Sequence, residues 1–285
     1  MNNRIKLSTV TTYKFGGYCD NFIELNSKED LNRIKKISDF KKLFILGKGS
    51  NVAFSDKGYE GVVIRSNLNN IYHDSKKGEI KVEAGYYLPD LARFYKKHNL
   101  ENAEFLIGIP GSVGGAVKMN AGAYENEFAD IIKSVETYNL ESHKIEILSR
   151  GELEFSYRKC NNLKNRLVTS VNLKASPGDP NKINKTLKSY IQYRKKTQPA
   201  GIYNAGSVFK NGKDYSAGEL IDKAGLKGYS VDGVRVSEKH ANFFIAPKGS
   251  KATSLYSLVN YVKEKVESEY GVSLEKEILF IGDFE

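Results

Sequence analysis

The sequence has no tryptophan and, among 285 residues, only two cysteines and four histidines. Cys19 and Cys160 stand outside any C-x-x-C pattern or Cys/His cluster, so the sequence supports neither a disulfide framework nor a zinc site. We expect both to be buried thiols. The histidines show no metal-ligand spacing, so no metal is predicted.

Long apolar runs are also absent. No stretch approaches the roughly 18 residues that a membrane-spanning helix needs, and residues 1–6 lead into polar sequence rather than into an apolar signal-peptide core. The composition, with 40% hydrophobic and 27% charged residues and only six prolines, is ordinary for a folded protein. These features exclude collagenous and disordered classes, and we expect a cytoplasmic protein without membrane insertion.

Positive charge is in excess, since 44 Lys and Arg face 34 Asp and Glu, giving a formal net charge of +10. Such an excess favours anionic partners: phosphorylated ligands, nucleic acid or an anionic surface. The lysines are spread along the chain rather than gathered in a tail or stripe, and no aromatic RNA-binding signature occurs. We therefore expect no nucleic-acid partner.

Hydrophobic periodicity and glycine punctuation divide the chain into three predicted lobes. Their ranges are 1–66, 67–181 and 182–274, and the segment 275–285 is a candidate to join the first. Strands and helices alternate irregularly, and the turns between them are too short for repeated crossovers. We therefore predict the α+β class rather than a doubly wound sheet.

Local patterns predict the elements of each lobe. In the first lobe, Ser27-x-x-Asp30 predicts a capped short helix, and strands are predicted at 43–46 and 61–64. The second lobe is predicted to hold a helix at 88–98 and a mainly antiparallel sheet with strands at 80–84, 134–138, 144–148 and 167–171. The third is predicted to hold a basic helix at 183–196 and a helix with apolar residues at 255, 258, 259, 262 and 266 that stops at Gly271.

A first glycine loop, Gly47-Lys48-Gly49-Ser50-Asn51, follows the predicted strand at 43–46. Glycines let main-chain N–H groups approach a phosphate, and Lys48 adds a positive charge. The dinucleotide-binding fingerprint fails because Val52 stands where a third glycine is needed, and a P-loop fails because the chain continues as a strand. A tight hairpin explains this loop as well as phosphate binding does.

A second loop, residues 108–116, contains four glycines and a proline in nine residues. An ordinary turn needs one or two, so the pattern favours a backbone passing close to a flat or charged group, with Ser112 and main-chain N–H groups as donors. The alternative is a strained packing loop. We expect bulk at Gly49 or Gly114 to abolish binding of such a group while leaving the fold largely intact.

Few catalytic candidates stand outside these loops. Arg158, Ser207 and Glu277 form no known triad, and no G-x-S-x-G elbow surrounds Ser207, so a hydrolase is not supported. Taken alone, the three are typical of a surface ion pair, a turn residue and a solvated charge. His240 lies in an unusual context, yet a satisfied or surface histidine explains it somewhat better than a site residue does.

Nine segments considered together form a more specific pattern. They are residues 12–17, 46–51, 104–111, 114–116, 120–124, 157–158, 197–199, 206–211 and 237–243. In this order they resemble the motifs of the UDP-N-acetylenolpyruvoylglucosamine reductases, also called UDP-N-acetylmuramate dehydrogenases. The resemblance covers about Thr12 to Gly282 and is closest to the compact branch of the family.

This resemblance implies a fold and a reaction. The fold is a two-lobed FAD-binding domain of the vanillyl-alcohol-oxidase type followed by a C-terminal α+β substrate domain. The reaction is the NADPH-dependent reduction of UDP-N-acetylglucosamine enolpyruvate to UDP-N-acetylmuramate in peptidoglycan precursor synthesis, and so in cell-wall biogenesis, cell shape and division. Hydride passes from NADPH to FAD and then to the vinyl carbon, after which an enolate-like intermediate is protonated. All three ligands are anionic, which agrees with the positive net charge.

The resemblance also implies residue roles. Ser207 resembles the proton donor, and Arg158 and Glu277 resemble the residues that bind and polarise the substrate carboxylate region, where a guanidinium can neutralise developing charge. The residues expected to bind FAD are Gly47, Lys48, Gly49, Ser50, Asn51, Gly108, Pro110, Gly111, Ser112, Gly114, Gly115, Asn120, Ala121 and Gly122. Those expected to bind the substrate are Tyr157, Lys210, Asn211 and His240. No Cys or His stands in either glycine loop, so we expect the FAD to be non-covalent.

Two departures from the family pattern affect these roles. The C-terminal motif lacks the arginine that follows the catalytic glutamate in the family, so Glu275 stays an alternative to Glu277. The stretch before Ser207 is short and lacks the family's tyrosine-bearing substrate loop. Tyr190 and Tyr193 lie on a predicted helix, and we do not assign them that role.

Two other functions stay open from the sequence. One is another FAD-dependent oxidoreductase on the same fold, since the first two lobes indicate FAD and little more. The other is a non-enzymatic nucleotide- or RNA-binding protein that uses the glycine loops as anion nests.

Overall fold

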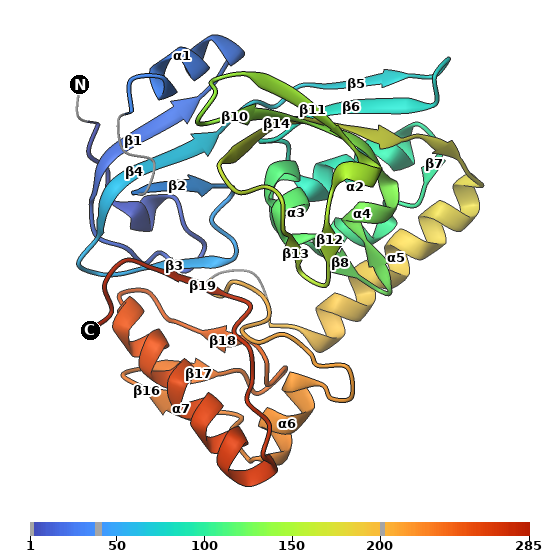
Figure 1. Ribbon diagram of the computed structural model, residues 1–285. Coiled ribbons are helices and arrows are strands. Elements are labelled where there is room, and N and C mark those ends of the chain that lie inside the picture. Colours follow the sequence, from blue (N-terminus) through green and yellow to red (C-terminus); the bar gives the residue numbers. More distant parts are fainter. Residues whose placement is uncertain (1–2, 38–41, 200–202) are drawn as a thin grey trace. The chain divides into compact units, whose positions relative to one another are not determined.

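The computed structural model describes residues 3–37, 42–199 and 203–285, and the chain divides into two compact units. Unit 1 comprises Met1–Asn21, Gly49–Val62 and Lys195–Glu285, and unit 2 comprises Phe22–Lys48 and Val63–Arg194. Helices and mainly antiparallel sheets are mixed along the chain (Figure 1), which confirms the predicted α+β class. The predicted division into three lobes stays a prediction.

Unit 2 is built on a five-stranded antiparallel sheet in the order β11-β10-β14-β6-β5. Its strands are β5 (Ile71–Asp74), β6 (Glu79–Glu83), β10 (Ile132–Asn139), β11 (Ile145–Ser149) and β14 (Arg166–Lys174). Val135 pairs with Val171, and Val171 pairs with Val82, so one buried apolar row crosses three strands. All four strands predicted for this sheet are confirmed.

Helices cover one face of this sheet (Figure 1). They are α2 (Leu88–Lys97), α3 (Val113–Met119) and α4 (Phe128–Ile131). The basic helix predicted at 183–196 is confirmed as α5 (Pro180–Thr197). Ile183 and Leu187 of α5 are buried in the core of unit 2, whereas the third predicted lobe was expected to begin at 182.

Shorter elements complete this part of the chain. Strands β1 (Cys19–Leu25), β4 (Tyr59–Ser66) and β2 (Leu43–Leu46) form a sheet in the order β1-β4-β2. The predicted cap at Ser27 is confirmed, because its main-chain N–H donates to Asp30 Oδ2 at 3.1 Å before α1 (Leu31–Ile34). The remaining elements are η2 (Lys28–Asp30), β7 (Leu100–Glu101), η3 (Glu104–Gly108), β8 (Gly122–Ala123), β9 (Asn126–Glu127), η4 (Arg150–Glu152), β12 (Phe155–Ser156), β13 (Lys159–Cys160) and β15 (Ser176–Pro177).

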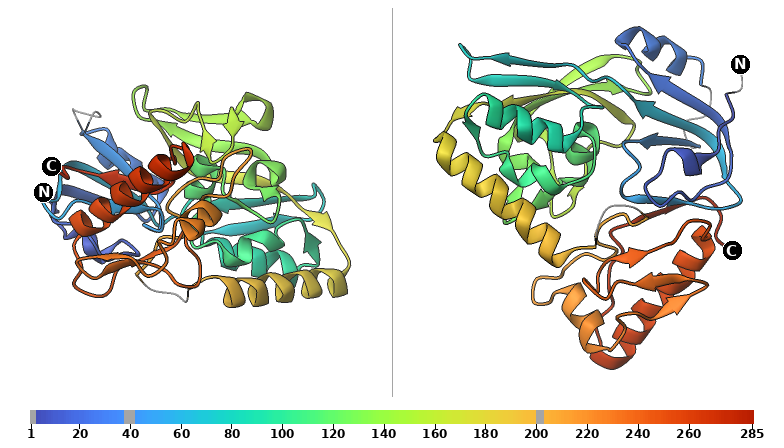
Figure 2. Two further views of the ribbon diagram at one scale, coloured as in Figure 1. Left: turned by 90° about the horizontal axis from the view of Figure 1, so that it is seen from below. Right: turned by 180° about the vertical axis from the view of Figure 1, so that it is seen from behind.

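Unit 1 has its own core around α7 (Ala252–Tyr270), which lies along a small three-stranded sheet (Figure 2). The five apolar positions predicted for this helix are all fully buried, and the helix ends at Gly271, whose φ is +67°. The other elements are η1 (Leu7–Thr9), α6 (Ala217–Lys223), β16 (Ser230–Val231), β17 (Val234–Val236), β18 (Phe244–Ile245) and the parallel pair β3 (Val52–Phe54) and β19 (Leu279–Ile281). The C-terminal segment therefore pairs with residues that follow the first glycine loop.

None of the helices that the structure describes combines the length and the apolar character needed to span a membrane.

Candidate active site

Within unit 2, the beginning of the first glycine loop lies beside the second loop. Gly47, directly after β2, lies so close to Ser112 that a β-carbon at Gly47 would stand 2.7 Å from Ser112 Oγ. Ser112 is the N-cap of α3, and its hydroxyl oxygen accepts the main-chain N–H of Gly115 at 3.4 Å. The absence of a side chain at Gly47 therefore allows the two loops to share one surface.

The second loop has room for a ligand at one glycine and not at another. The main-chain N–H of Gly114 donates to the carbonyl of Ala84 at 2.8 Å, so this N–H is not one of the main-chain donors to a ligand that the sequence predicts for the loop. At Gly115, by contrast, a β-carbon would touch, apart from the neighbouring backbone of its own helix, only Ser112 Oγ among the described residues, at 3.4 Å. The residues present thus fit a group that approaches the backbone at Gly115.

The fold itself requires a glycine at position 49. It is buried with φ at +69°, and a β-carbon there would overlap the carbonyl oxygen of Val10 and stand 2.8 Å from Thr11 Cα. The expectation that bulk at Gly49 leaves the fold intact is therefore wrong, because the clash is with the protein's own main chain. Gly114 is tight as well, with its β-carbon position 3.1 Å from Ala84 Cβ.

Asn51 connects the first loop to the C-terminal segment within unit 1. Its Nδ2 donates to the carbonyl of Glu277 at 3.0 Å, and its own carbonyl accepts the N–H of Leu279 at 3.0 Å. These bonds extend the pairing of β3 with β19. Ser50 and Lys48 beside it are half-buried, and the cofactor roles of all three stay predictions.

Asn120 is buried, and the protein itself occupies its side chain. Its Nδ2 donates to Glu127 Oε2 at 2.7 Å and to the carbonyl of Ser156 at 3.1 Å, while Oδ1 accepts the N–H of Ala129 at 3.1 Å. Any cofactor contact from Asn120 would have to use its main chain. What the side chain does is hold the β12-β13 hairpin, which carries Arg158.

Arg158 occupies the tip of that hairpin in a left-handed backbone conformation, with φ at +57°. Its Nη2 donates to the carbonyl of Gly122 at 3.1 Å, and its guanidinium carbon lies 4.6 Å from the centre of the Tyr157 ring. Glu127 Oε1 is 3.9 Å from Nη1. Gly122, predicted to bind the cofactor, therefore orients Arg158, and so does the exposed Tyr157, which was predicted to bind the substrate.

The beginning of the second loop contacts α5. The side chain of Arg194 fills the position that a β-carbon at Gly108 would take. Tyr190, on the same helix, stacks on Tyr124 with ring centres 3.7 Å apart. Tyr190 therefore lies on a helix, as predicted, and its ring packs against Tyr124 within unit 2.

Pro110 and Gly111 continue the second loop toward α3, and the main-chain N–H of Ala121 donates to the carbonyl of Ala116.

Ser207 and Glu277 lie on neighbouring segments of unit 1. Ser207 forms a β-bridge with Phe243, and the next residue, Val208, accepts the N–H of Glu277 at 2.8 Å. Both side chains are half-buried. The structure therefore brings together two of the three predicted catalytic residues, while Arg158 belongs to unit 2.

Asn242 was not singled out from the sequence, yet it holds the segment that carries Ser207. Its side chain is buried, with Oδ1 accepting the N–H of Phe209 at 2.9 Å and Nδ2 donating to the carbonyl of Phe209 at 2.8 Å. Its own carbonyl accepts the N–H of Val208 at 2.9 Å. The available signal was a polar amide within the apolar run Ala241–Ile245.

The two C-terminal carboxylates have different surroundings. The Glu275 side chain is 70% exposed and pairs with Lys210 Nζ at 2.6 Å, whereas Glu277 is half-buried beside the Ser207 segment. This difference favours Glu277 over Glu275 as the catalytic carboxylate. Lys210, predicted to contact the substrate, has its ammonium group in this ion pair.

Asn211 and His240 satisfy main-chain groups. Asn211 Oδ1 accepts the N–H of Ala217 at 3.0 Å, at the beginning of α6. His240 Nδ1 accepts the N–H of Asn242 at 3.3 Å, and its ring centre lies 4.7 Å from that of Phe243. Nδ1 of His240 is therefore satisfied by a hydrogen bond within the protein, which agrees with the alternative of a satisfied histidine. Contact of Asn211 or His240 with the substrate stays a prediction.

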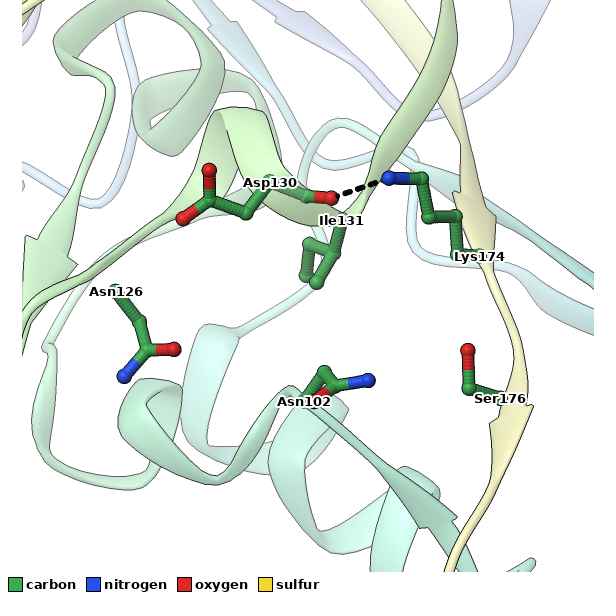
Figure 3. Close-up of a pocket in the computed structure, with 6 residues that line it drawn as sticks. All are labelled: Asn102, Asn126, Asp130, Ile131, Lys174 and Ser176. Atoms are coloured by element: carbon green, nitrogen blue, oxygen red, sulfur yellow. Dashed lines mark hydrogen bonds between the residues drawn. The ribbon is translucent and has the colours of Figure 1, made fainter.

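A polar cavity of about 400 Å³ in unit 2 does not coincide with this site (Figure 3). None of the predicted site residues lines it, and the two charged side chains that line it, Lys174 and Asp130, have partners in the protein. Lys174 Nζ donates to the carbonyl of Asp130 at 2.7 Å, and the carboxylate of Asp130 accepts the N–H of Glu127 at 2.8 Å. We assign the cavity no part in the reaction.

No metal site is found within the described ranges, where no three His, Cys, Asp or Glu side chains gather around a common point. Cys19 and Cys160 are buried free thiols, as predicted, and burial raises the pKa of both.

Two ranges of the chain match known protein families. Residues 20–146 match the FAD binding domain family, and residues 198–281 match the C-terminal domain of UDP-N-acetylenolpyruvoylglucosamine reductase. The enzyme of that name from Nostoc sp. is 36% identical over 98% of this chain and 86% of its own length, and the one from Caldanaerobacter subterraneus is 39% identical over 96% and 91%. The crystal structure of UDP-N-acetylenolpyruvylglucosamine reductase from Thermus caldophilus is 33% identical, covers 99% of both chains and superposes with a TM-score of 0.86. The predicted fold and family are thereby confirmed, and this chain belongs to the UDP-N-acetylenolpyruvoylglucosamine reductase family.

Proposed function

We propose that this protein reduces UDP-N-acetylglucosamine enolpyruvate to UDP-N-acetylmuramate in the synthesis of peptidoglycan precursors, with FAD as its cofactor, NADPH as its reductant and the cytoplasm as its location. The observation that carries the proposal is a match to reductases of this name over nearly the whole chain. A match restricted to the FAD-binding part would have left other flavoenzymes equally open.

FAD, when bound, supplies the hydride that the vinyl carbon of the substrate receives. The surface shared by Gly47, Ser112 and the open face of Gly115 supports its placement in unit 2. The proposed cofactor residues are those of the two glycine loops and of residues 120–122. For Asn120 the proposal is limited to the main chain, because its side chain is occupied.

The chain's own groups have three proposed tasks. Arg158 binds the substrate carboxylate through its planar fork, because charge delocalises onto this group after hydride addition. Glu277 helps to bind and polarise the same region. Ser207 donates the proton to the carbon beside the carboxylate, which completes the reduction and leaves an alkoxide that must recover a proton from its surroundings.

The proposal is tested with the purified holoenzyme. NADPH oxidation should depend on added enolpyruvyl nucleotide, and mass spectrometry should find product heavier by one hydride and one proton. NADPH oxidation that ignores this substrate would favour another flavoenzyme, and a colourless protein that FAD cannot reconstitute would favour a non-enzymatic nucleotide-binding role.

A further inference from the structure

Two cations lie close together at the first glycine loop in unit 2. Lys48 directly follows Gly47, and Arg65 is the penultimate residue of β4, which neighbours β2 in the sheet. Burial, and then the positive charge of Arg65, lower the pKa of Lys48. The protein thus holds two like charges near each other in a half-buried place.

Arg65 is also incompletely bonded. Its Nε is buried and has no hydrogen-bond partner among the residues that the structure describes. Carboxylates compensate the two cations weakly. Glu24 Oε1 is 4.0 Å from Nη1 of Arg65, and Asp90, which acts on Lys48, pairs with Arg93 at 2.5 Å. In the protein without a ligand, the buried donor that lacks a partner and the repulsion between the two cations each lower the stability of the folded state.

Such a cost is offset when an anion binds to the folded protein. Among the anions that the proposed function requires, the diphosphate of FAD is the one we select, because Gly47 beside Lys48 contacts Ser112 of the second loop. Lys48, Arg65 and Ser112 also all fall within the range that matches the FAD binding domain family. We propose, on the basis of the proposed function, that Arg65 is a further cofactor-binding residue that binds the FAD diphosphate together with Lys48.

The test compares FAD with riboflavin, which has the same ring system and no phosphate. Apoprotein is titrated with each, and dissociation constants are measured by the quenching of flavin fluorescence at several salt concentrations. Arg65→Gln should weaken FAD binding roughly 10- to 100-fold, as expected for a charge-assisted hydrogen bond. It should leave riboflavin binding unchanged and reduce the salt dependence of FAD binding. Arg65→Lys should fall between the wild type and Arg65→Gln.

Arg166→Gln is the matched control, because Arg166 also lies in unit 2 but both of its bonds to Glu146 are satisfied. It should change neither flavin affinity. Thermal unfolding of the apoproteins adds a second readout: Arg65→Gln should be at least as stable as the wild type without FAD and should gain less stability when FAD is added.

Unchanged FAD affinity in Arg65→Gln, or equal loss of FAD and riboflavin affinity, would overturn this inference. If Arg65→Gln does not fold, Arg65→Lys decides by the same two affinities. A wild-type protein that binds no FAD would instead contradict the proposed function, so the two failures are distinguishable.

Discussion

The main-chain N–H of Glu277 donates to the carbonyl oxygen of Val208 at 2.8 Å and so fixes the segment bearing Glu277 beside the segment bearing Ser207. Asn242 holds the segment bearing Ser207, because both polar atoms of its side chain bond to the main chain of Phe209. Main-chain bonds and the side chain of Asn242 therefore position Ser207 and Glu277. Substitution of either side chain leaves the main-chain bond between Glu277 and Val208 in place.

Ser207→Ala should separate the two halves of the catalytic cycle. Reduction of bound FAD by NADPH needs no proton from Ser207, so its rate should stay near that of the wild type. Reoxidation by the enolpyruvyl nucleotide should slow by roughly 10²- to 10⁴-fold, as is usual when a positioned general acid is removed. Stopped-flow flavin absorbance measures both, and wild-type rates in both halves would make Ser207 a turn residue only.

Glu277→Gln and Glu275→Gln form a matched pair of variants. Glu277 is half-buried beside Ser207, so its variant should lose about 10²-fold in turnover through the loss of a preorganised charge. Glu275 is 70% exposed and pairs only with Lys210 among the contacts found for it, so its variant should keep near-normal turnover. Steady-state NADPH oxidation measures both, and the opposite order would move the catalytic role to Glu275.

Arg158 should show a conflict between stability and activity. Its φ of +57° costs a non-glycine residue about 1 kcal/mol, so Arg158→Gly should be more stable than Arg158→Ala by about that amount. Denaturant unfolding of the two variants gives this difference. Neither should turn over, and Arg158→Lys should also lose roughly 10²-fold because a lysine has no planar fork. An active Arg158→Gly would contradict the assigned role.

Gly115 provides the cleaner test of the cofactor loops. Gly115→Ala adds a methyl group in α3 where only Ser112 Oγ is near, so the apoprotein should keep or gain stability. FAD affinity measured by fluorescence titration should nevertheless fall. Gly151→Ala, whose β-carbon would meet none of the described residues beyond its chain neighbours within 4 Å, is the control and should leave FAD affinity unchanged. Equal FAD affinity in the two variants would remove Gly115 from the cofactor surface.

Much of the fold could be predicted because its signals are local. Strands β6 and β11 alternate in burial with a period of two, the cap at Ser27 needs a residue three positions later, and α7 repeats apolar residues up to Gly271. The order of the motifs also identified the family. These features depend on neighbours in the sequence, which a single chain displays.

The roles of single polar residues could not be predicted in the same way. Asn120 bonds to Ser156, 36 residues away, and Asn242 bonds to Phe209, 33 residues away. Gly49 is required by Val10, which no spacing rule connects to it. Such partners are set by tertiary approach, so the sequence displayed the motif residues but not whether each serves the ligand or the fold.

The most direct test of the account is to reduce the wild-type holoenzyme with one equivalent of NADPH without oxygen, and then to add UDP-N-acetylglucosamine enolpyruvate. The account predicts that the flavin absorbance returns within the turnover time and that UDP-N-acetylmuramate forms in equal amount. Flavin that stays reduced in the presence of this substrate, or that is reoxidised without formation of the saturated product, would contradict the account.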